Sequence, residues 1–180
     1  MRPGSIRVKL LWEELPDAHQ MRNHSIGNAG EFYVLAQLAQ RGYIAGKTDD
    51  GQTLIDLIAT DPKTLKAVNI QVKSTAQFCG YWMTGLKARK SFESLWYVFV
   101  LLGSPNEMPE FFVFHSSEVA AGVDEHYQLW LAKPMKDGSP RKSKDIVNRF
   151  QPSPERLEEA RNQWELMFSS SPHSAGQHLD

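Results

Sequence analysis

The sequence has little cysteine and no long apolar run. Cys79 is its single cysteine, which excludes an internal disulfide and a cysteine-based zinc site. Residues 1–11 carry basic side chains but no apolar stretch of signal-peptide length. The longest apolar run, residues 95–102, is too short to span a bilayer. We therefore expect a cytoplasmic protein that has no membrane partner.

The sequence also lacks an excess of positive charge. It has 20 Lys and Arg against 21 Asp and Glu, for a net charge of −1. A protein that coats nucleic acid without regard to sequence is usually basic, so binding here would need a local basic surface or a partner. There is no phosphate-cradling glycine-rich loop and no dinucleotide-binding fingerprint. The histidines do not have zinc-ligand spacing.

The composition is that of one soluble globular domain, with 180 residues, 41% hydrophobic and 23% charged. We predict an N-terminal arm at 1–24, a single domain at 25–168 and a disordered tail at 169–180. Leucines of the arm and Trp12 could dock on the body or on a larger partner.

Helical spacing of apolar residues predicts a first helix over 25–41, capped by Ser25 or Asn23 and stopped by Gly42. Residues 54–60 and 67–74 predict two strands of an antiparallel hairpin, because Asp61-Pro62-Lys63 between them is a turn signal.

The second half of the chain predicts more mixed structure. We expect helices over 86–94, 117–121 and 154–168, central buried strands over 95–102 and 111–114, a further strand over 127–131 and a loop over 133–144. The fold class is therefore α/β, with a mixed central sheet flanked by helices.

Polar side chains converge on one face of the predicted hairpin. If residues 61–66 form the turn, paired residues have numbers that sum to about 127, so Asp56 lies opposite Gln71. Lys73 shares that face, since side chains alternate along a strand. The neighbouring residues are apolar, and charged groups among them cost free energy unless they are paired, hydrated or bound to metal.

Glu31 is a fourth candidate. On the first helix it lies on the same side as Val34, Leu35 and Leu38, where a carboxylate is unusual. The plainer alternatives are an exposed hairpin with an Asp–Lys ion pair, and a glutamate placed early in its helix by the helix dipole.

Four short motifs resemble those of the PD-(D/E)xK nuclease superfamily, and of its small stand-alone members similar to Holliday-junction resolvases and uncharacterised bacterial proteins. The motifs are Gly30-Glu31, Arg41-Gly42-Tyr43, Ile55-Asp56-Leu57 and Gln71-Val72-Lys73-Ser74. The resemblance covers roughly residues 25–75. It implies a restriction-endonuclease-like core of order αβββαβ.

The resemblance also implies a metal-dependent endonuclease that cuts DNA in restriction, repair, recombination or mobile-element movement. Asp56 would be the main ligand of Mg²⁺ or Mn²⁺, with the Val72 carbonyl and Gln71 completing the shell. Glu31 would bind a second metal or a metal-bound water, and Lys73 would activate the attacking water. Gln71 stands where the family usually has an acid, so metal binding would be weaker or would depend on a DNA phosphate to complete the shell.

Several basic residues are candidates to contact nucleic acid, although such segments are often only hydrated loops. They are Lys87, Lys90, Lys133, Lys136, Arg141, Lys142 and Lys144. Two alternatives to an endonuclease remain: a weakened nuclease-fold module that binds nucleic acid or protein without cutting, and a structural subunit whose Leu10–Leu15 arm and last helix dock onto a larger partner. As a nuclease, the chain could act as a homodimer.

Overall fold

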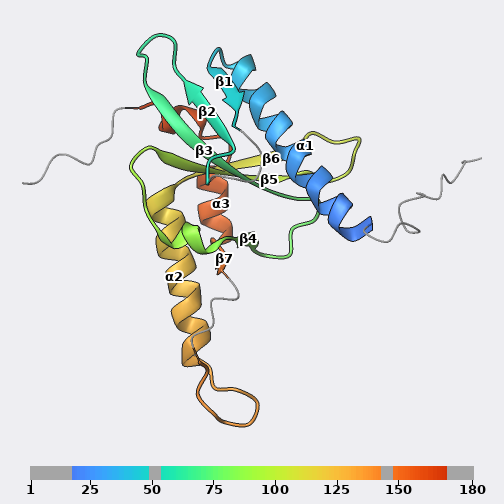
Figure 1. The fold of residues 1–180 in the computed structure, drawn as a ribbon, viewed down its shortest axis with the longest axis vertical. Helices are drawn as coiled ribbons and strands as arrows, with labels where there is room; N and C mark the ends of the chain where they lie inside the picture. The colour runs from blue at the N-terminus through green and yellow to red at the C-terminus, as the bar shows by residue number, and fades with distance from the viewer. Residues whose placement is uncertain (1–17, 49–53, 143–147, 170–180) are drawn as a thin grey trace, which may run out of the picture.

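The computed structural model describes residues 18–48, 54–142 and 148–169 (Figure 1). The predicted arm up to residue 17, the tail from residue 170 and Lys144 lie outside the described residues. In the part of the chain that is described, no helix combines the length and apolar character that crossing a membrane requires.

The first helix, α1, spans Ala18–Gln40 and so begins earlier than the predicted residue 25. It ends where predicted. Gly42 has a φ of +83°, and the amides of Gly42 and Tyr43 donate to the carbonyls of Ala39 and Leu38 at 3.0 and 3.1 Å. Glycine adopts this left-handed conformation without the steric cost of a Cβ, so it closes the helix.

A five-stranded mixed sheet follows, in the order β1-β2-β3-β5-β6. Its strands are β1 (Ile44–Lys47), β2 (Leu57–Thr60), β3 (Ala67–Thr75), β5 (Leu95–Leu101) and β6 (Glu110–His115). Neighbouring strands are antiparallel except β3 and β5, which are parallel. The predicted α/β class with a mixed sheet between helices is confirmed. The edge strand β1 was not predicted, because four residues including a glycine give little periodicity.

The predicted hairpin register is also confirmed. Leu57 pairs with Ile70 and Thr60 with Ala67, so the paired numbers sum to 127. The turn depends on Asp61, whose carboxylate accepts hydrogen bonds from the Lys63 amide and the Thr64 hydroxyl, both at 2.9 Å. Such side-chain bonds stabilise a turn in place of ladder bonds.

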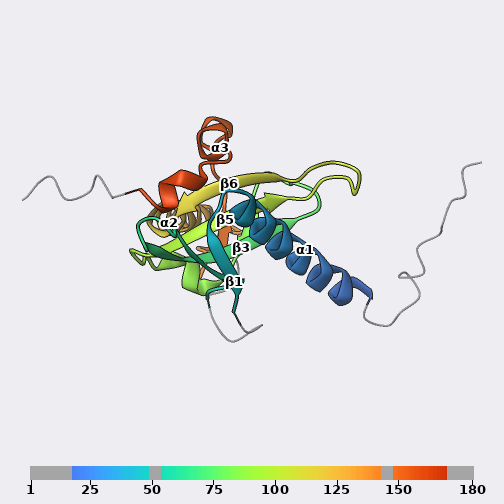
Figure 2. The same cartoon turned by 90° about the horizontal axis from the view of Figure 1, so that it is seen from above.

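Each face of the sheet has its own core. One is covered by α1 and the short 3₁₀ helix η3 (Trp164–Met167), which pack Val34, Leu38 and Trp164 against Val72 and Val98. The other face is covered by α2 (Ser116–Ala132), α3 (Pro154–Ala160) and a small sheet of β4 (Trp82–Thr84) and β7 (Asn148–Phe150). Figure 2 shows α1 and α3 on different sides of the strands.

Tertiary packing overrides several predictions in the second half. The predicted helix at 117–121 and strand at 127–131 are one continuous helix, α2, because Val119, Val123 and Tyr127 bury a stripe at i, i+4 spacing. The predicted helix at 86–94 is only the 3₁₀ turn η2 (Leu86–Arg89).

The predicted helix at 154–168 divides in two. Its start is confirmed, since Ser153 caps α3 by accepting from the Arg156 amide. The helix ends at Ala160, and Asn162 adopts a φ of +55°. This break allows η3 to bury Trp164 in the core on the other face of the sheet. Of the two strands expected to be central, β5 is interior while β6 is at an edge, where Phe112 forms a bridge with Arg161.

Candidate active site

Asp56 lies at the entrance to β2, where the ladder with β3 begins. Its amide donates to the Ile70 carbonyl at 2.9 Å. Its Oδ2 accepts from the Val72 amide at 2.7 Å and from Nε2 of Gln71. The Asp56 carboxylate therefore accepts the β3 hydrogen bond that the backbone of one more paired β2 residue would have accepted. The expected proximity of Asp56 and Gln71 is present.

The same geometry turns a backbone oxygen toward Asp56. The amide and the carbonyl of one strand residue point to the same neighbouring strand, and the Val72 amide points to Asp56. The Val72 carbonyl is therefore on the Asp56 side, beyond the point where β2 pairs with β3. A carbonyl and a carboxylate on the same side of a strand end are hard oxygen donors of the kind that divalent cations prefer.

Gln71 and Lys73 lie on the face of the sheet that α2 covers. They pair across β3 and β5 with Tyr97 and Phe99, whose rings belong to that core. Gln71 is only 5% exposed, and Lys73 is half-buried. Among the described residues, the Lys73 ammonium has no hydrogen bond or ion pair, although its charge acts on Asp56.

The pKa of Asp56 is raised above its ordinary value. Burial of the carboxyl group is the largest cause. The negative charge of Glu31 acts in the same direction, while the Val72 amide, the Lys73 charge and the Gln71 amide favour the ionised form without outweighing burial. Burial therefore disfavours the ionised Asp56 carboxylate. A divalent cation bound beside it would offset this cost.

Glu31 comes to the site from the other face of the sheet. Gly30 lets α1 approach β3 closely: a Cβ there would lie 1.7 Å from Ser74 Oγ. Glu31, the next residue, forms an ion pair of 2.7 Å with Lys47 of β1, and its side chain is 16% exposed. The structure places the Glu31 carboxylate against Lys47 of the edge strand, and its negative charge acts on Asp56.

Tyr97 is a site residue that sequence reasoning missed. Its side chain is fully buried beside Gln71, and its hydroxyl has no hydrogen-bond partner among the described residues. Burial and the charge of Asp56 raise the pKa of Tyr97 to about 12. The residue is hidden in an apolar run, and only the parallel register with β3 brings it to the polar face.

The predicted nucleic-acid contacts fall into two groups. Lys87 and Lys90 lie at η2, and they line a pocket beside the hairpin. Lys133 and Arg141 lie at the far end of α2, where Arg141 stacks on Trp130 with 4.7 Å from Cζ to the ring centroid and donates to the Lys133 carbonyl. Lys136 and Lys142 are exposed in the segment that follows α2.

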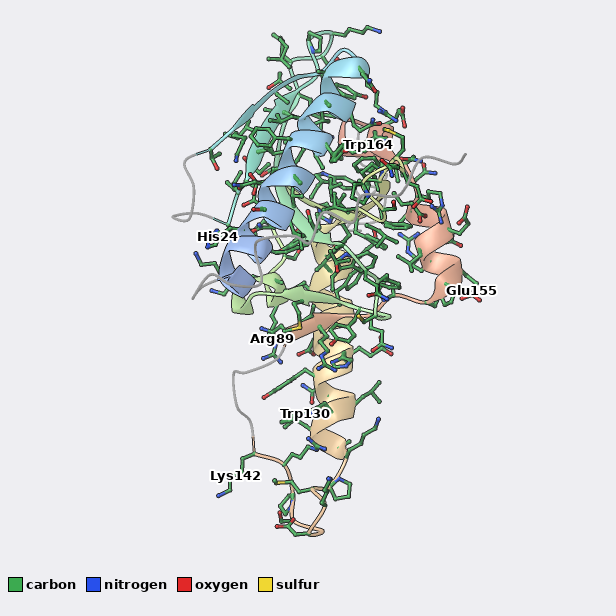
Figure 3. All side chains as sticks on the ribbon, turned by 90° about the vertical axis from the view of Figure 1, so that its right-hand side faces the viewer. His24, Arg89, Trp130, Lys142, Glu155 and Trp164 are labelled. Carbon is green, nitrogen blue, oxygen red and sulfur yellow. The ribbon has the colours of Figure 1, made fainter. Side chains whose placement is uncertain are left out.

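Figure 3 shows the separation of these groups, with Arg89 of η2 near the sheet, Trp130 farther along α2 and Lys142 beyond it. The second group therefore lies away from η2 (Figure 3). Lys133 lines a separate pocket of about 510 Å³ between α2 and β7. Of the predicted contacts that the structure describes, Lys87 and Lys90 are the ones that share a pocket with Ile55, the neighbour of Asp56.

Comparison with known proteins leaves the family open. No family model matches the sequence, and no curated protein matches it. A solved structure of a bacterial homing endonuclease is similar over 79% of this chain and 88% of that chain, with 14% sequence identity and a TM-score of 0.42. At that identity and TM-score, the likeness by itself establishes neither the family nor the activity of this chain.

Proposed function

We propose that this chain is a metal-dependent endonuclease that hydrolyses DNA phosphodiester bonds with Mg²⁺ or Mn²⁺. One observation carries the proposal: burial disfavours the ionised form of the Asp56 carboxylate, and the charge that acts on it most favourably is the Lys73 ammonium, which has no hydrogen bond or ion pair within the described part of the chain. The Val72 carbonyl lies on the Asp56 side of β3, because the Val72 amide points to that carboxylate. A cation at Asp56 would offset the burial cost, and a phosphate that bridges it to Lys73 would use the remaining charge.

The donors at this site suit a hard cation. Among the described residues, no three His, Cys, Asp or Glu side chains form a group that could hold a metal. The set consists instead of the Asp56 carboxylate, the Val72 carbonyl and the amide oxygen of Gln71, with Glu31 near. Mg²⁺ accepts such oxygens and keeps several waters, so one strong ligand with neutral ones is compatible with weak binding.

When bound, the cation would polarise a water and stabilise charge on the phosphate. In this proposal Asp56 orients the cation, and Lys73 contributes positive charge where the phosphate oxygens become more negative. Glu31, which Lys47 holds, positions a water at the edge of the site. Gln71 holds the Asp56 carboxylate through its amide.

The direct test is cleavage of single-stranded, double-stranded and branched DNA, with RNA in parallel, in Mg²⁺ or Mn²⁺. Lys73→Ala and Asp56→Asn should abolish cleavage while the folded state persists. Lys63→Ala, an exposed lysine on the hairpin turn, is the matched control and should keep full activity. Wild-type protein that cuts none of these substrates in either metal would refute the proposal.

A second candidate is a nuclease-fold module that binds without cutting. It is favoured by one observation: Gln71 and Lys47 already engage the two acidic side chains. In that case calorimetry with millimolar Mg²⁺ shows no binding heat, and Asp56→Ala leaves DNA affinity unchanged. Binding heat that disappears in Asp56→Asn would instead support the endonuclease.

A further inference from the structure

A pocket of about 400 Å³ opens beside the candidate active site. Ile55, which precedes Asp56, lines it, and so does Asn69, two residues before Gln71 on the same face of β3. Its other apolar walls are Leu54, Phe92 and Leu95. The volume and the apolar lining with a few polar groups are typical of a small-ligand site.

The walls of this pocket are held from two sides. Ser116, fully buried at the start of α2, donates to the Phe92 carbonyl at 2.7 Å and accepts from its amide at 2.9 Å. Asn69 donates to the Ser94 hydroxyl through its side chain and to the Ser94 carbonyl through its amide, at 3.0 and 2.8 Å. The Phe92 ring is nevertheless 45% exposed. The result is an exposed aromatic ring on a fixed backbone.

Positive charge lies at the same pocket on a fixed element. Lys87 and Lys90 line it and are exposed. Between them, Arg89 forms an ion pair with Asp124 at 3.1 Å and stacks over Tyr127 at 4.0 Å, which attaches η2 to α2. Both lysines therefore stay beside the apolar pocket, because the element that carries them is attached to α2.

We propose that this pocket holds the base of a nucleotide next to the scissile phosphate, and that the substrate is DNA with an unpaired nucleotide at that position. The inference rests on the proposed function for the adjacent phosphate site. Phe92 stacks on the base, Asn69 presents its amide to the base edge, and Lys87 and Lys90 contact the neighbouring phosphates. A strand that crosses Asp56 would place its next nucleotide here.

The pocket selects an unpaired base for a physical reason. A base inside a duplex is stacked on both faces, and its edge is occupied by its partner, so it must leave the stack to enter a pocket. That cost is small for a nucleotide in a gap, flap or loop. Base–aromatic stacking tolerates every base, so the pocket selects DNA structure rather than sequence.

Fluorescence anisotropy in EDTA tests this without cleavage. The probes are a short labelled duplex with a single-stranded gap, the same duplex with the gap filled, and the gapped duplex with abasic gap nucleotides. We expect the gapped DNA to bind about tenfold tighter than the filled or abasic DNA, as loss of one stacked base implies. Phe92→Ala should lose that tenfold on gapped DNA alone, and Phe92→Tyr should keep it.

Met108→Ala removes another exposed apolar side chain and should change no affinity. The abasic probe leaves the protein unaltered, so the test stands even if Phe92→Ala does not fold. Equal affinity for gapped and abasic DNA would overturn the proposal. Base-dependent binding without any cleavage in Mg²⁺ or Mn²⁺ would support the pocket and refute the endonuclease. Cleavage without base-dependent binding would support the endonuclease and refute the pocket.

Discussion

Replacing Asp56 by Asn should make the metal-free protein more stable while it abolishes metal binding. Both hydrogen bonds to the side chain end on one oxygen, Oδ2, with donors from Val72 and Gln71. The Asn oxygen can take that position and keep both bonds. The charge, whose burial raises the pKa of Asp56, is removed, together with its repulsion from Glu31.

At neutral pH, Asp56→Asn should raise the free energy of unfolding by about 1 kcal/mol, the usual scale for a stabilising substitution at a functional site. The lost attraction to Lys73 opposes it but does not reverse it, because the pKa of Asp56 is raised despite that attraction. For a chain of this length, the gain corresponds to a Tm increase of about 2–4 °C. Mg²⁺ at a hundred times Kd would stabilise the wild type by about 2.7 kcal/mol. In Mg²⁺ the wild type should therefore have a higher Tm than Asp56→Asn.

The pH dependence provides a second check. Since the pKa of Asp56 is raised in the folded state, the unfolded chain loses this proton first as pH rises. The metal-free wild type should therefore lose stability as pH rises from about 4 through the folded pKa. The Tm difference between Asp56→Asn and the wild type should be small below about pH 4 and grow above it.

Thermal unfolding by circular dichroism, in EDTA and in Mg²⁺, measures these quantities. Asp61→Asn is the control, because hydrogen bonds from Lys63 and Thr64 lower the pKa of Asp61. Its ionised form is favoured in the folded state, so this variant should not gain Tm at neutral pH. A clear loss of Tm in metal-free Asp56→Asn would refute the reasoning, since it would show that the carboxylate stabilises the fold.

Three further predictions concern neighbouring residues. Gly30→Ala should lower the free energy of unfolding in urea by about 2 kcal/mol, because the added Cβ would clash with Ser74. Adding Ser74→Gly to the same chain should recover most of the loss. If Gly30→Ala alone were as stable as wild type, it would contradict the close approach of α1 to β3. Gln71→Glu should lower the metal-free Tm by placing a second acid beside Asp56, and tighten Mn²⁺ binding roughly tenfold in calorimetry by adding a charged ligand; unchanged affinity would argue that residue 71 is not a ligand. Tyr97→Phe should keep or raise Tm, since it removes a buried hydroxyl without a partner among the described residues. It should also leave the pH profile of cleavage unchanged below pH 10, because the pKa of Tyr97 is about 12. A shifted profile would show that the phenol titrates in the reaction.

Local signals were sufficient where a residue's own chemistry decides the backbone. Gly42 ended α1 because it adopts a positive φ without strain. The Asp61 turn placed the hairpin in the predicted register, and that register brought Asp56 to Gln71. Alternation along β3 then placed Lys73 on the Gln71 face. These parts of the site follow from a few consecutive residues.

Local signals failed where distant packing chose between alternatives. Residues 127–131 have strand-like composition, yet they continue α2 because Tyr127 extends the stripe of Val119 and Val123. Helix α3 ends at Ala160, since Trp164 must reach the opposite core. The apolar pattern is compatible with either result, and the free energy of burial is available only once the partner surfaces exist.

The sequence by itself determined the hairpin, its register and the face of β3 shared by Gln71 and Lys73, because these depend on turn chemistry and on the two-residue period of a strand. Only the tertiary structure decided that Glu31 pairs with Lys47, that Tyr97 comes to the site, and that Phe92 and the η2 lysines line a pocket beside Asp56. Those contacts join segments far apart in the chain, and their positions depend on how the whole sheet and its helices pack.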